Sequence, residues 1–462
     1  MDYYTALASK LLFPLHERLK GHSTVRVHRE LEQTQWWSPD QLLDLQVRRL
    51  RALLIDVAEN VPYYGPLLAK HGIKPAAVDS LDVLHKLPRL EKPAIRAHTE
   101  AMRHRHAKGL SRFATGGSTG DPLVFFIGRR RVSHDVAAKW RATRWWDVDI
   151  GDREVVVWGS PIELGAQDRV RVLRDRLFRS TLLPAFEMTE AKLGGFLDAI
   201  RRARPKMLFG YPYSLAYIAQ YACRHDIQLD DIGVKVAFVT SETLYPQQRK
   251  LIGEVFGCPV ANGYGGRDAG FIAHECPAGQ MHITAEDIIV EVLDIDGQPV
   301  PPGQSGEFVV THLATGDFPF IRYRTGDIGS LGTVACGCGR GLPVLKELQG
   351  RAVDFLTAID GTAIPGGAFT YLIRETDGIE SFKIVQQSLA LTEVELVTDP
   401  SFDPADIDRL IEKFRLRLGR QAQVVIVRVA SINLEQSGKF RYITSKVSAW
   451  PRGPEPDLSR HA

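Results

Sequence analysis

Hydrophobic residues in the N-terminal part of the chain recur near helical spacing in a charged background. The clearest set is four leucines, Leu42, Leu45, Leu50 and Leu54. Apolar side chains at this spacing lie on one face of a helix and turn that face toward a core. The segment Val61-Pro62-Tyr63-Tyr64 interrupts the pattern. We therefore expect residues 1–102 to be mostly helical.

Short apolar runs alternate with helical patterns in the middle of the chain. The runs that read as buried strands are Val155–Trp158, Met207–Phe209, Val234–Val239, Ile288–Leu293 and Phe308–Val310. This alternation is typical of layered α/β structure. Asp296-Gly297 lies between two of the runs and is a hairpin-turn signal.

The last hundred residues have the pattern of a separate small α+β domain. Its strand-like runs are Phe382–Gln386, Glu393–Val397 and Val424–Val429. Between the second and third runs, Asp403-Pro404 offers an N-cap with proline at the first helical position. One apolar helical face follows, and Gly419 ends it. The predicted order is β-β-α-β, with a polar, frayed tail from Pro451 to Ala462.

Composition narrows the functional classes. The chain has 462 residues, of which 44% are hydrophobic and 24% charged, with a net charge of +3. This charge is too mild to indicate a nucleic-acid partner, and no apolar run is long enough to span a membrane. Five unevenly spread cysteines favour a reducing cytoplasm over a disulfide framework. The arginine-rich stretches Arg129–Arg131 and Arg169–Arg179 are interpreted as solvated faces, or alternatively as contacts for an acidic partner or lipid.

A loop rich in glycine, serine and threonine precedes the apolar run Leu123–Ile127. Its residues are Thr115, Gly116, Gly117, Ser118, Thr119 and Gly120. Small hydroxylated residues and glycines let backbone and side-chain donors converge on phosphate oxygens. The loop lacks the Walker pattern, and on composition alone a flexible turn explains it equally well.

Four later segments occur in a fixed order with this loop: Tyr264–Asp268 (YGGRD), Tyr323–Asp327 (YRTGD), Gly350–Asp354 (GRAVD) and Ser437–Arg441 (SGKFR). The ordered set resembles the adenylate-forming enzymes, which include acyl- and aryl-CoA ligases. Within them, the chain is most similar to the phenylacetate–CoA ligase-like branch of capsule and exopolysaccharide gene clusters. The resemblance covers residues 140–447. The segments specific to this branch are Leu208–Ser214, Thr240–Leu244, Gly265–Cys276 and Ser437–Val447.

The resemblance implies an α/β fold with a large N-terminal domain of layered sheets and helices and a small C-terminal α+β lid. Residues 1–102 would be the helical start of the large domain and residues 103–351 its nucleotide- and acyl-binding core. Residues 352–450 would form the mobile lid, and residues 451–462 a flexible tail.

The resemblance also assigns nucleotide-binding roles. Loop residues 115–120 would hold the β- and γ-phosphates, with Ser118 and Thr119 as hydroxyl donors; Asp121 stands where many relatives carry lysine. Tyr264 would pack beside adenine, or else be a core tyrosine. Asp327 would accept the ribose hydroxyls.

The remaining roles concern the metal and the lid. Asp268 replaces the family's glutamate as a catalytic Mg²⁺ ligand, unless it is only a turn residue. Arg351 would touch the nucleotide, and Asp354 falls at the hinge. Lys439, on the lid, would bridge the carboxylate and the α-phosphate as a catalytic residue.

A second group of residues has the donors of a structural zinc site: Cys276, His282, Cys336 and Cys338. Three thiolates and one imidazole make a closed tetrahedral set, and some relatives in this branch bind zinc with similar residues. The alternative is a set of unrelated free thiols. Cys223 and Cys258 read as small core residues.

The expected reaction converts a small carboxylic acid and ATP, with Mg²⁺, to an acyl-adenylate and pyrophosphate. A thiol, coenzyme A, then takes the acyl group; a carrier protein or a sugar is the alternative acceptor, and a non-catalytic scaffold of the same fold is the alternative function. Segments Trp158–Pro161, Phe209–Ser214 and Gly263–Gly266 are expected at the acyl site, where aromatic residues suit a flat or apolar acid.

Overall fold

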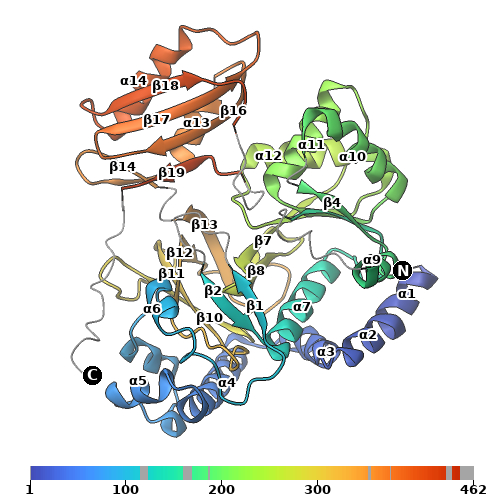
Figure 1. Ribbon diagram of the computed structural model, residues 1–462, viewed down its shortest axis with the longest axis vertical. Helices are drawn as coiled ribbons and strands as arrows, with labels where there is room; N and C mark the ends of the chain where they lie inside the picture. Colours follow the sequence, from blue (N-terminus) through green and yellow to red (C-terminus); the bar gives the residue numbers. More distant parts are fainter. Residues whose placement is uncertain are drawn as a thin grey trace.

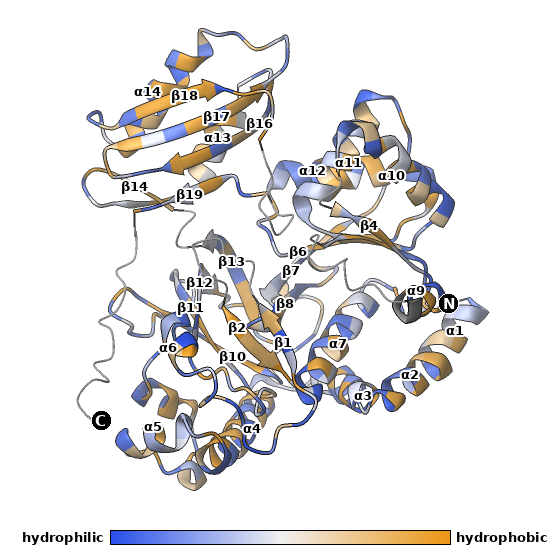
Figure 2. Ribbon diagram, viewed as in Figure 1, coloured by the Kyte–Doolittle hydropathy of each residue, from blue (hydrophilic) through white to orange (hydrophobic). Residues whose placement is uncertain are grey.

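The computed structural model describes residues 2–114, 123–159, 169–185, 188–351, 355–374, 376–432 and 440–447. It confirms the predicted α/β class, with a large domain built on an 11-stranded sheet and a small C-terminal domain built on a four-stranded sheet (Figure 1). Many strand residues in both sheets are apolar (Figure 2). In the small domain, β16 (Ile379–Gln386) and β17 (Leu391–Thr398) alternate buried positions with partly exposed ones, so one face of that sheet carries its core.

The N-terminal part is helical, as expected. Its elements are α1 (Tyr3–Leu7), η1 (Ala8–Leu12), α2 (Phe13–Leu19), α3 (Thr24–Thr34), α4 (Pro39–Asn60), α5 (Tyr64–Lys70), η2 (Pro75–Ala77), η3 (Leu81–Lys86) and α6 (Lys92–Ala97). A capping box between Ser38 and Gln41 starts α4, and Pro39 occupies the first turn. All four leucines of the predicted apolar face are buried. The helix ends just before Pro62, where the pattern predicted a break.

A short antiparallel pair follows, β1 (Ser111–Ala114) and β2 (Val124–Ile127), with Ser111 opposite Ile127. These two strands flank the predicted phosphate loop, which lies outside the described residues. α7 (Arg129–Arg144) comes next and packs on α3.

The large sheet has a parallel half and an antiparallel half. The parallel strands, from the edge inward, are β4 (Ser180–Pro184), β3 (Glu154–Trp158), β5 (Met207–Gly210), β6 (Val236–Thr240) and β7 (Val260–Gly266). Their helices are α9 (Arg169–Leu177), α10 (Glu190–Ala203), α11 (Pro212–Arg224) and α12 (Pro246–Phe256), with the short turn η5 (Asp230–Ile232) before β6. One apolar core lies between the buried strands of this half and helices α10 to α12.

The antiparallel half continues from β7 across the sheet. Its strands, in spatial order, are β8 (Gly270–Glu275), β9 (Met281–Ile283), β13 (Val344–Arg351), β12 (Tyr323–Leu331), β11 (Gly306–His312) and β10 (Ile288–Leu293). A second, larger core joins these strands to β1, β2, α4 and α5. The turn signal at Asp296-Gly297 is confirmed as a tight turn in the longer connection from β10 to β11, where Gly297 has a φ of 81°.

The C-terminal domain contains β14 (Phe355–Thr357), β15 (Ala363–Pro365), α13 (Gly367–Arg374), β16 (Ile379–Gln386), β17 (Leu391–Thr398), α14 (Asp406–Leu418), β18 (Gln423–Arg428) and β19 (Ile443–Ser445). The predicted β-β-α-β order corresponds to β16, β17, α14 and β18. The predicted helix start is wrong by two positions. Asp403 accepts a hydrogen bond from the Ala405 N–H and thereby caps a preceding turn, and α14 begins at Asp406. The domain has its own core around Phe369, Phe382 and Phe414.

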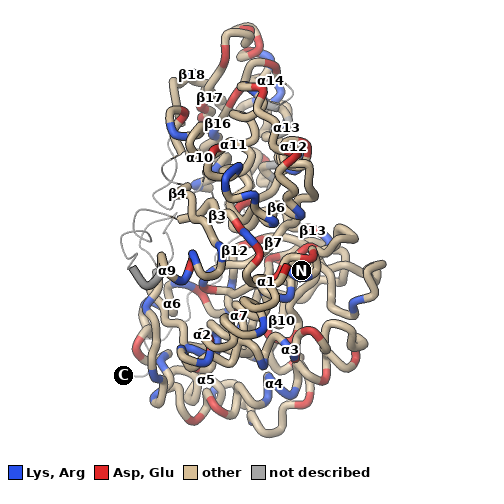
Figure 3. Tube along the Cα trace, turned by 90° about the vertical axis from the view of Figure 1, so that its right-hand side faces the viewer, with Lys and Arg blue, Asp and Glu red and all other residues tan. Residues whose placement is uncertain are grey.

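Charged residues of both signs are interspersed along the described chain (Figure 3), without a single-sign region of the kind that nucleic-acid grooves show. Among the described helices, none combines the length and apolar character needed to cross a bilayer.

Candidate active site

Two sequence motifs, YGGRD and YRTGD, meet through a reciprocal pair of hydrogen bonds. The Tyr264 hydroxyl donates to Asp327 Oδ2 at 2.7 Å. The Tyr323 hydroxyl donates to Asp268 Oδ2 at 2.6 Å. Each motif therefore supplies the tyrosine that orients the other motif's carboxylate. Three strands separate β7 from β12 in the sheet, so these contacts join two motifs that the sheet order would otherwise keep apart.

Glycines bring the backbone of the first motif close to its neighbours. A Cβ at Gly265 would lie 2.2 Å from the Gly270 carbonyl oxygen across the β7–β8 hairpin. A Cβ at Gly266 would lie 2.6 Å from Asp268 Oδ1. Gly270 has a φ of 91°, in the region that favours glycine. The turn that presents Asp268 is therefore possible only with small residues at these positions.

The Arg131 side chain holds the backbone of the same turn. It is 2% exposed, and its guanidinium donates to the carbonyl oxygens of Arg267 at 3.3 Å and Asp268 at 3.5 Å. Asp135, one helical turn further along α7, pairs with Arg131 at 2.8 Å. The prediction that Arg129–Arg131 is a solvated face is thus wrong for Arg131, although Arg129 and Arg130 are exposed. The i,i+4 Arg–Asp spacing was the available sequence signal.

His312 lies on the other side of Asp135. Its Nε2 is 3.6 Å from Asp135 Oδ1, and its Nδ1 accepts from the Ala314 N–H. Burial lowers the pKa of His312 to about 4. Burial by itself raises the pKa of Asp135, but Arg131 and His312 outweigh it and hold that pKa below its usual value. The group is therefore an Arg–carboxylate pair with a neutral histidine at neutral pH.

The strand that leads into the predicted phosphate loop lies close to the first motif. The guanidinium of Arg267 sits 5.6 Å from the centroid of the Phe113 ring, at the end of β1. The described part of the chain thus brings residue 113, two positions before Thr115, next to the turn that carries Asp268. Thr115–Gly120 themselves lie outside the described residues.

The C-terminal domain contacts the large domain through the residues that follow Lys439. The backbone N–H of Phe440 donates to Glu242 Oε1 at 3.0 Å, and Glu242 Oε2 accepts from the Tyr213 N–H at 3.2 Å. The Phe440 ring stacks on Tyr213, with centroids 4.4 Å apart and planes 10° apart. Tyr442 packs edge-on against Tyr245. Glu242 and Tyr213 belong to segments that the sequence singled out, but their contact with the lid was not predicted.

Other predicted residues lie at or beyond the limits of the description. Lys439 and the hinge residue Asp354 lie outside the described residues. The backbone of Arg351 pairs with Asp327 across β12 and β13, so the two positions are adjacent. Cys258 is buried as expected, but Cys223 is exposed, which corrects its assignment to the core.

A row of aromatic rings runs beneath the first motif. The Trp158 and Phe209 centroids are 5.6 Å apart, and the Phe209 and Phe238 centroids 6.0 Å apart. A Cβ at Gly263 would lie 2.9 Å from the Phe238 ring, so the glycine lets the strand approach the row. The Lys139 ammonium sits 3.9 Å above the Phe209 ring. Parts of the three predicted acyl-site segments are thereby brought together.

The cysteine–histidine set also converges. One ligand atom from each of Cys276, His282, Cys336 and Cys338 lies within 4.8 Å of all the others. The Sγ atoms of Cys276 and Cys336 are 3.6 Å apart, and Cys338 Sγ is 3.2 Å from His282 Nε2. A tetrahedral zinc with bonds of about 2.3 Å requires Sγ–Sγ separations of about 3.8 Å. The donor set and its spacing therefore fit zinc.

The histidine in this set has its other nitrogen occupied. His282 Nδ1 is 3.1 Å from the Leu342 carbonyl oxygen, which fixes Nδ1 as the protonated nitrogen and directs Nε2 toward the thiols. Burial lowers the pKa of His282 to about 4, so its imidazole is neutral near pH 7. Burial raises the pKa of Cys336 to about 12. A divalent cation reverses that penalty by stabilising the thiolate.

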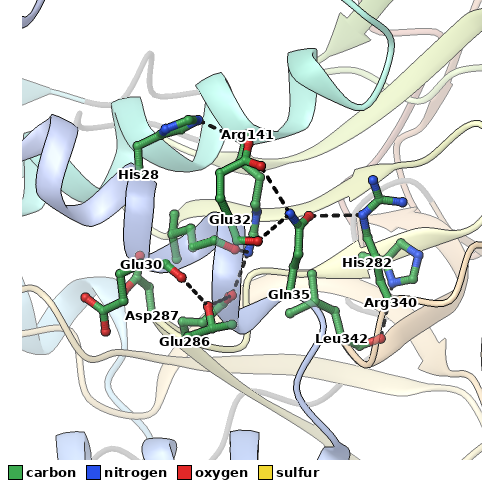
Figure 4. A network of polar contacts seen from close by, with 12 residues as sticks. His28, Glu30, Glu32, Gln35, Arg141, His282, Glu286, Asp287, Arg340 and Leu342 are labelled. Atoms are coloured by element: carbon green, nitrogen blue, oxygen red, sulfur yellow. Dashed lines mark hydrogen bonds and ion pairs between the residues drawn. The ribbon is translucent and has the colours of Figure 1, made fainter.

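A buried polar network connects this cysteine–histidine cluster to the N-terminal helices (Figure 4). Gln35 Oε1 accepts from Arg340 Nε at 3.1 Å and from the Trp145 indole at 2.8 Å. Arg141 and Glu286 form an ion pair at 2.6 Å, both almost fully buried. Desolvation offsets much of the attraction in such a pair, but removing one partner would leave a buried charge unpaired. Helices α3 and α7 are thereby fixed to the loop that carries Cys338 and to the segment after β9, the strand that carries His282.

Comparison with known proteins places this geometry in a family. A family model for the CapK C-terminal domain matches residues 356–446. Protein CapK of Staphylococcus aureus is 24% identical over 420 residues, which is 88% of this chain and 90% of the relative. Phenylacetate-coenzyme A ligase of Thermus thermophilus is 25% identical over 393 residues, or 79% and 83% of the two chains. The chain is a distant homologue of these proteins of the adenylate-forming superfamily. Within it, the chain is a distant member of the CapK and phenylacetate–CoA ligase-like family.

Solved structures of adenylate-forming ligases share the fold. 2-Hydroxyisobutyryl-CoA ligase in the postadenylation state, in complex with R3-HIB-AMP, has a TM-score of 0.73 at 20% identity, covering 90% of this chain and 91% of that one. The same ligase with 2-HIB-AMP and CoA in the thioesterification state has a TM-score of 0.61 at 21% identity, with the same coverage. The similarity spans both domains of the chain.

Proposed function

We propose that this adenylate-forming protein activates a small carboxylic acid with ATP and Mg²⁺ and then transfers the acyl group to the thiol of coenzyme A. In the first step, a carboxylate oxygen attacks the α-phosphate, and pyrophosphate leaves. In the second step, the thiol sulfur attacks the acyl carbon, its proton passes to solvent, and AMP leaves. Relatives with phenylacetate-coenzyme A ligase in their names support this reaction class.

The reciprocal Tyr–Asp pairs are the observation that carries the proposal. A carboxylate accepts several hydrogen bonds, so Asp327 can be oriented by Tyr264 and still accept from ribose hydroxyls. Asp268 is oriented in the same way by Tyr323, and its hard oxygens suit Mg²⁺. The two roles require carboxylates fixed at a set separation, which the crossed contacts provide.

The contact between Glu242 and Phe440 supports a role for Lys439 in the first step. Phe440 directly follows Lys439, and Glu242 and Tyr213 hold it against the start of α11. A compact positive charge in this region suits the charge that develops on the α-phosphate. Rotation of the lid would then remove Lys439 and admit the thiol.

The aromatic row supports a flat or apolar acid. Trp158 keeps part of its surface exposed, the buried rings of Phe209 and Phe238 pack in a row with it, and Lys139 adds one ammonium at Phe209. These contacts allow stacking with an aromatic acid or packing with a branched one.

We also propose one structural zinc ion, held by Cys276, His282, Cys336 and Cys338. Four protein ligands close the coordination shell, so the ion would have no open position for chemistry. It would connect the loop after β8 to the loop between β12 and β13.

A second acceptor class remains open because of the CapK relationship. The family model that matches the C-terminal domain and the Staphylococcus aureus relative both carry the CapK name. In that case, a carrier-protein thiol or a sugar hydroxyl or amine would take the acyl group in polysaccharide biosynthesis.

Pyrophosphate exchange into ATP, measured against a panel of carboxylic acids, tests the first step. We expect exchange only with a suitable acid, and Asp327→Asn should abolish most of it. Adding coenzyme A should then produce AMP and a thioester. Exchange without any thioester would select the alternative acceptors, whereas no ATP binding at millimolar concentration would overturn the enzymatic function.

A further inference from the structure

One face of the N-terminal helical segment presents a row of large apolar side chains to solvent. Helices α1, η1 and α2 form one continuous segment from Tyr3 to Leu19. Every fourth residue is exposed and apolar, with exposed fractions of 97% for Tyr3, 44% for Leu7, 57% for Leu11, 52% for Leu15 and 80% for Leu19. Single exposed leucines are common, but an aligned row marks an interaction surface.

The π turn in the middle of the segment helps to align this leucine row. In an α-helix with 3.6 residues per turn, a four-residue repeat drifts around the axis by about 40° per step. The π turn from Ala8 to Leu12 is wider and offsets part of this drift. The opposite face is buried, with the Phe13 ring 5.2 Å from the Trp140 ring. The segment is therefore attached to the domain by one face and exposes the leucines on the other.

The exposed charges beside the leucine row are positive. From Tyr3 to Lys20, the exposed charged residues are Lys10, Arg18 and Lys20; the exposed acid just before this span, Asp2, pairs with Arg179 at 2.8 Å. The one acid in this span, Glu17, is 4% exposed, and it accepts hydrogen bonds from Thr24 and lies 3.0 Å from His22. Its charge is thus turned inward. The helix presents apolar side chains and cations to solvent together.

The end of α9 extends this surface. The Tyr4 hydroxyl donates to the Leu177 carbonyl oxygen at 2.8 Å, which joins α1 to α9 (Figure 1). α9 adds Leu173, which is 68% exposed, and the exposed cation Arg176. The helix that Tyr4 joins to α1 therefore also exposes an apolar side chain and a cation.

We propose that the leucine row, together with Lys10, Arg18 and Lys20, docks on an anionic lipid surface. An amphipathic helix in the plane of a bilayer buries its apolar face at the acyl boundary and places its cations among anionic headgroups. The positive charge beside the leucine row favours a lipid surface over a second copy of the chain as the partner of this face. In a two-fold contact with a second copy, the same cations would face one another, whereas acidic headgroups neutralise them. The ligase would then work at a membrane surface, where an acyl acceptor or a lipid-linked product can be reached.

Co-sedimentation with vesicles tests the proposal. The full chain should bind vesicles of phosphatidylcholine mixed with phosphatidylglycerol and should not bind phosphatidylcholine alone. Raising the salt to about 0.5 M should weaken binding. At that ionic strength the Debye length is shorter than the separation between the helix cations and most of the lipid headgroups, so their attraction is screened. The double variant Leu11→Gln/Leu15→Gln should lower the partition coefficient about tenfold. Lys10→Glu/Lys20→Glu should lower it by at least tenfold, since each cation near the surface contributes about fivefold.

Matched controls come from the C-terminal domain. Leu416 on α14 is 68% exposed, and Arg420 is also exposed; Leu416→Gln and Arg420→Glu should bind vesicles like the wild type. All four variants should keep the wild-type thermal midpoint, because the changed side chains are on the surface. Equal binding to neutral vesicles, or full binding by the leucine variant, would overturn the proposal. A dimer that the leucine variant converts to a monomer, without vesicle binding, would assign this face to a second copy instead.

Discussion

The reciprocal Tyr–Asp pairs and the cysteine–histidine cluster connect the same two stretches of chain in two chemically different ways. Both join the β7–β9 region to the β12–β13 region. The Tyr–Asp contacts use hard oxygens that also suit hydroxyls and Mg²⁺. The cluster uses soft sulfur ligands that suit zinc and leave no position for substrate. One connection can therefore bind and release ligands while the other holds the backbone behind it.

This difference predicts how each connection fails. Changes on the Tyr–Asp side should reduce rates and nucleotide affinity with little effect on folding. Changes at the cluster should destabilise the fold first and reduce activity as a consequence. A kinetic readout and a thermal readout on each variant therefore separate the two connections.

The largest effect is expected for Lys439, which we propose acts as the cation that the lid brings to the nucleotide. Lys439→Ala should slow acyl-adenylate formation by on the order of 10²–10³, the usual cost of removing a preorganised charge at such a transition state. Thioester formation from pre-made acyl-adenylate should change far less. Single-turnover assays of each half-reaction measure this. An equal loss in both half-reactions would mean that Lys439 is structural or that the lid does not rotate.

Asp327→Asn tests the Tyr–Asp side directly. The amide is uncharged, so its hydrogen bonds with the ribose hydroxyls are no longer charge-assisted. Two such bonds contribute about 1.5 kcal/mol or more each. Their loss corresponds to about a hundredfold decrease in kcat/KM for ATP. The thermal midpoint should stay close to that of the wild type, because the amide oxygen can still accept from Tyr264. A large drop in the thermal midpoint with unchanged kinetics would mean that Asp327 stabilises the fold and does not bind the nucleotide.

Cys336→Ser tests the cluster. We expect about one zinc ion per chain in protein purified without chelator, and a clear loss of zinc in the variant. Unfolding stability should fall by about 3 kcal/mol, since the metal contributes binding energy only to the folded state. ATP binding should weaken while the preference among acids stays unchanged. Cys258→Ser is a matched control, because Cys258 is also buried but lies outside the cluster. Wild-type activity with a zinc content near zero would disprove the assignment.

The sequence singled out the two motifs and the four cluster residues, but it gave Tyr323 no role and did not predict which tyrosine pairs with which aspartate. Cys276, His282, Cys336 and Cys338 were recognised because ligand chemistry depends on residue type. Which tyrosine meets which aspartate depends on how the sheet curves between β7 and β12, and no local pattern records that. Arg131 was misread for a similar reason, since a run of arginines has the same composition whether one member is buried or not.

The C-terminal domain likewise has elements that the sequence predicted and contacts that it did not. Its β-β-α-β pattern was predictable from the sequence, because its strands contain short apolar runs and α14 has one apolar helical face. The contact of Phe440 with Glu242 joins positions almost two hundred residues apart and depends on how two domains are oriented. The start of α14 was misplaced because Asp403 caps a turn and not the helix.

Acid should lower the stability of the fold through the buried His312, which lies against Asp135 and takes no part in the Tyr–Asp contacts. Its pKa is lowered to about 4 in the folded state from an ordinary value of 6.5. The unfolded chain therefore takes up a proton first as pH falls, so stability is fully present above pH 6.5 and is lost as pH falls toward 4. The loss can reach about 3 kcal/mol.

Denaturant unfolding measured from pH 7 to pH 4 should show a shallower decline in the free energy of unfolding for His312→Gln than for the wild type. The exposed His225→Gln should follow the wild type, and an identical decline in all three proteins would exclude His312 as the cause.

The smallest effect is expected for Arg131→Lys, which tests whether the turn that carries Asp268 needs a guanidinium. The planar guanidinium reaches Asp135 and two backbone carbonyls at once, whereas an ammonium is a point charge on a flexible stem. Lysine keeps the charge near Asp135, so the fold should survive. The KM for Mg·ATP should rise about fivefold, with a smaller change in kcat, because Asp268 is displaced before chemistry begins.

Raising free Mg²⁺ should recover part of the loss in Arg131→Lys but none of it in Asp327→Asn. If Mg²⁺ recovers neither variant, Arg131 does not act through Asp268, and the Tyr–Asp side is organised by the two tyrosines alone.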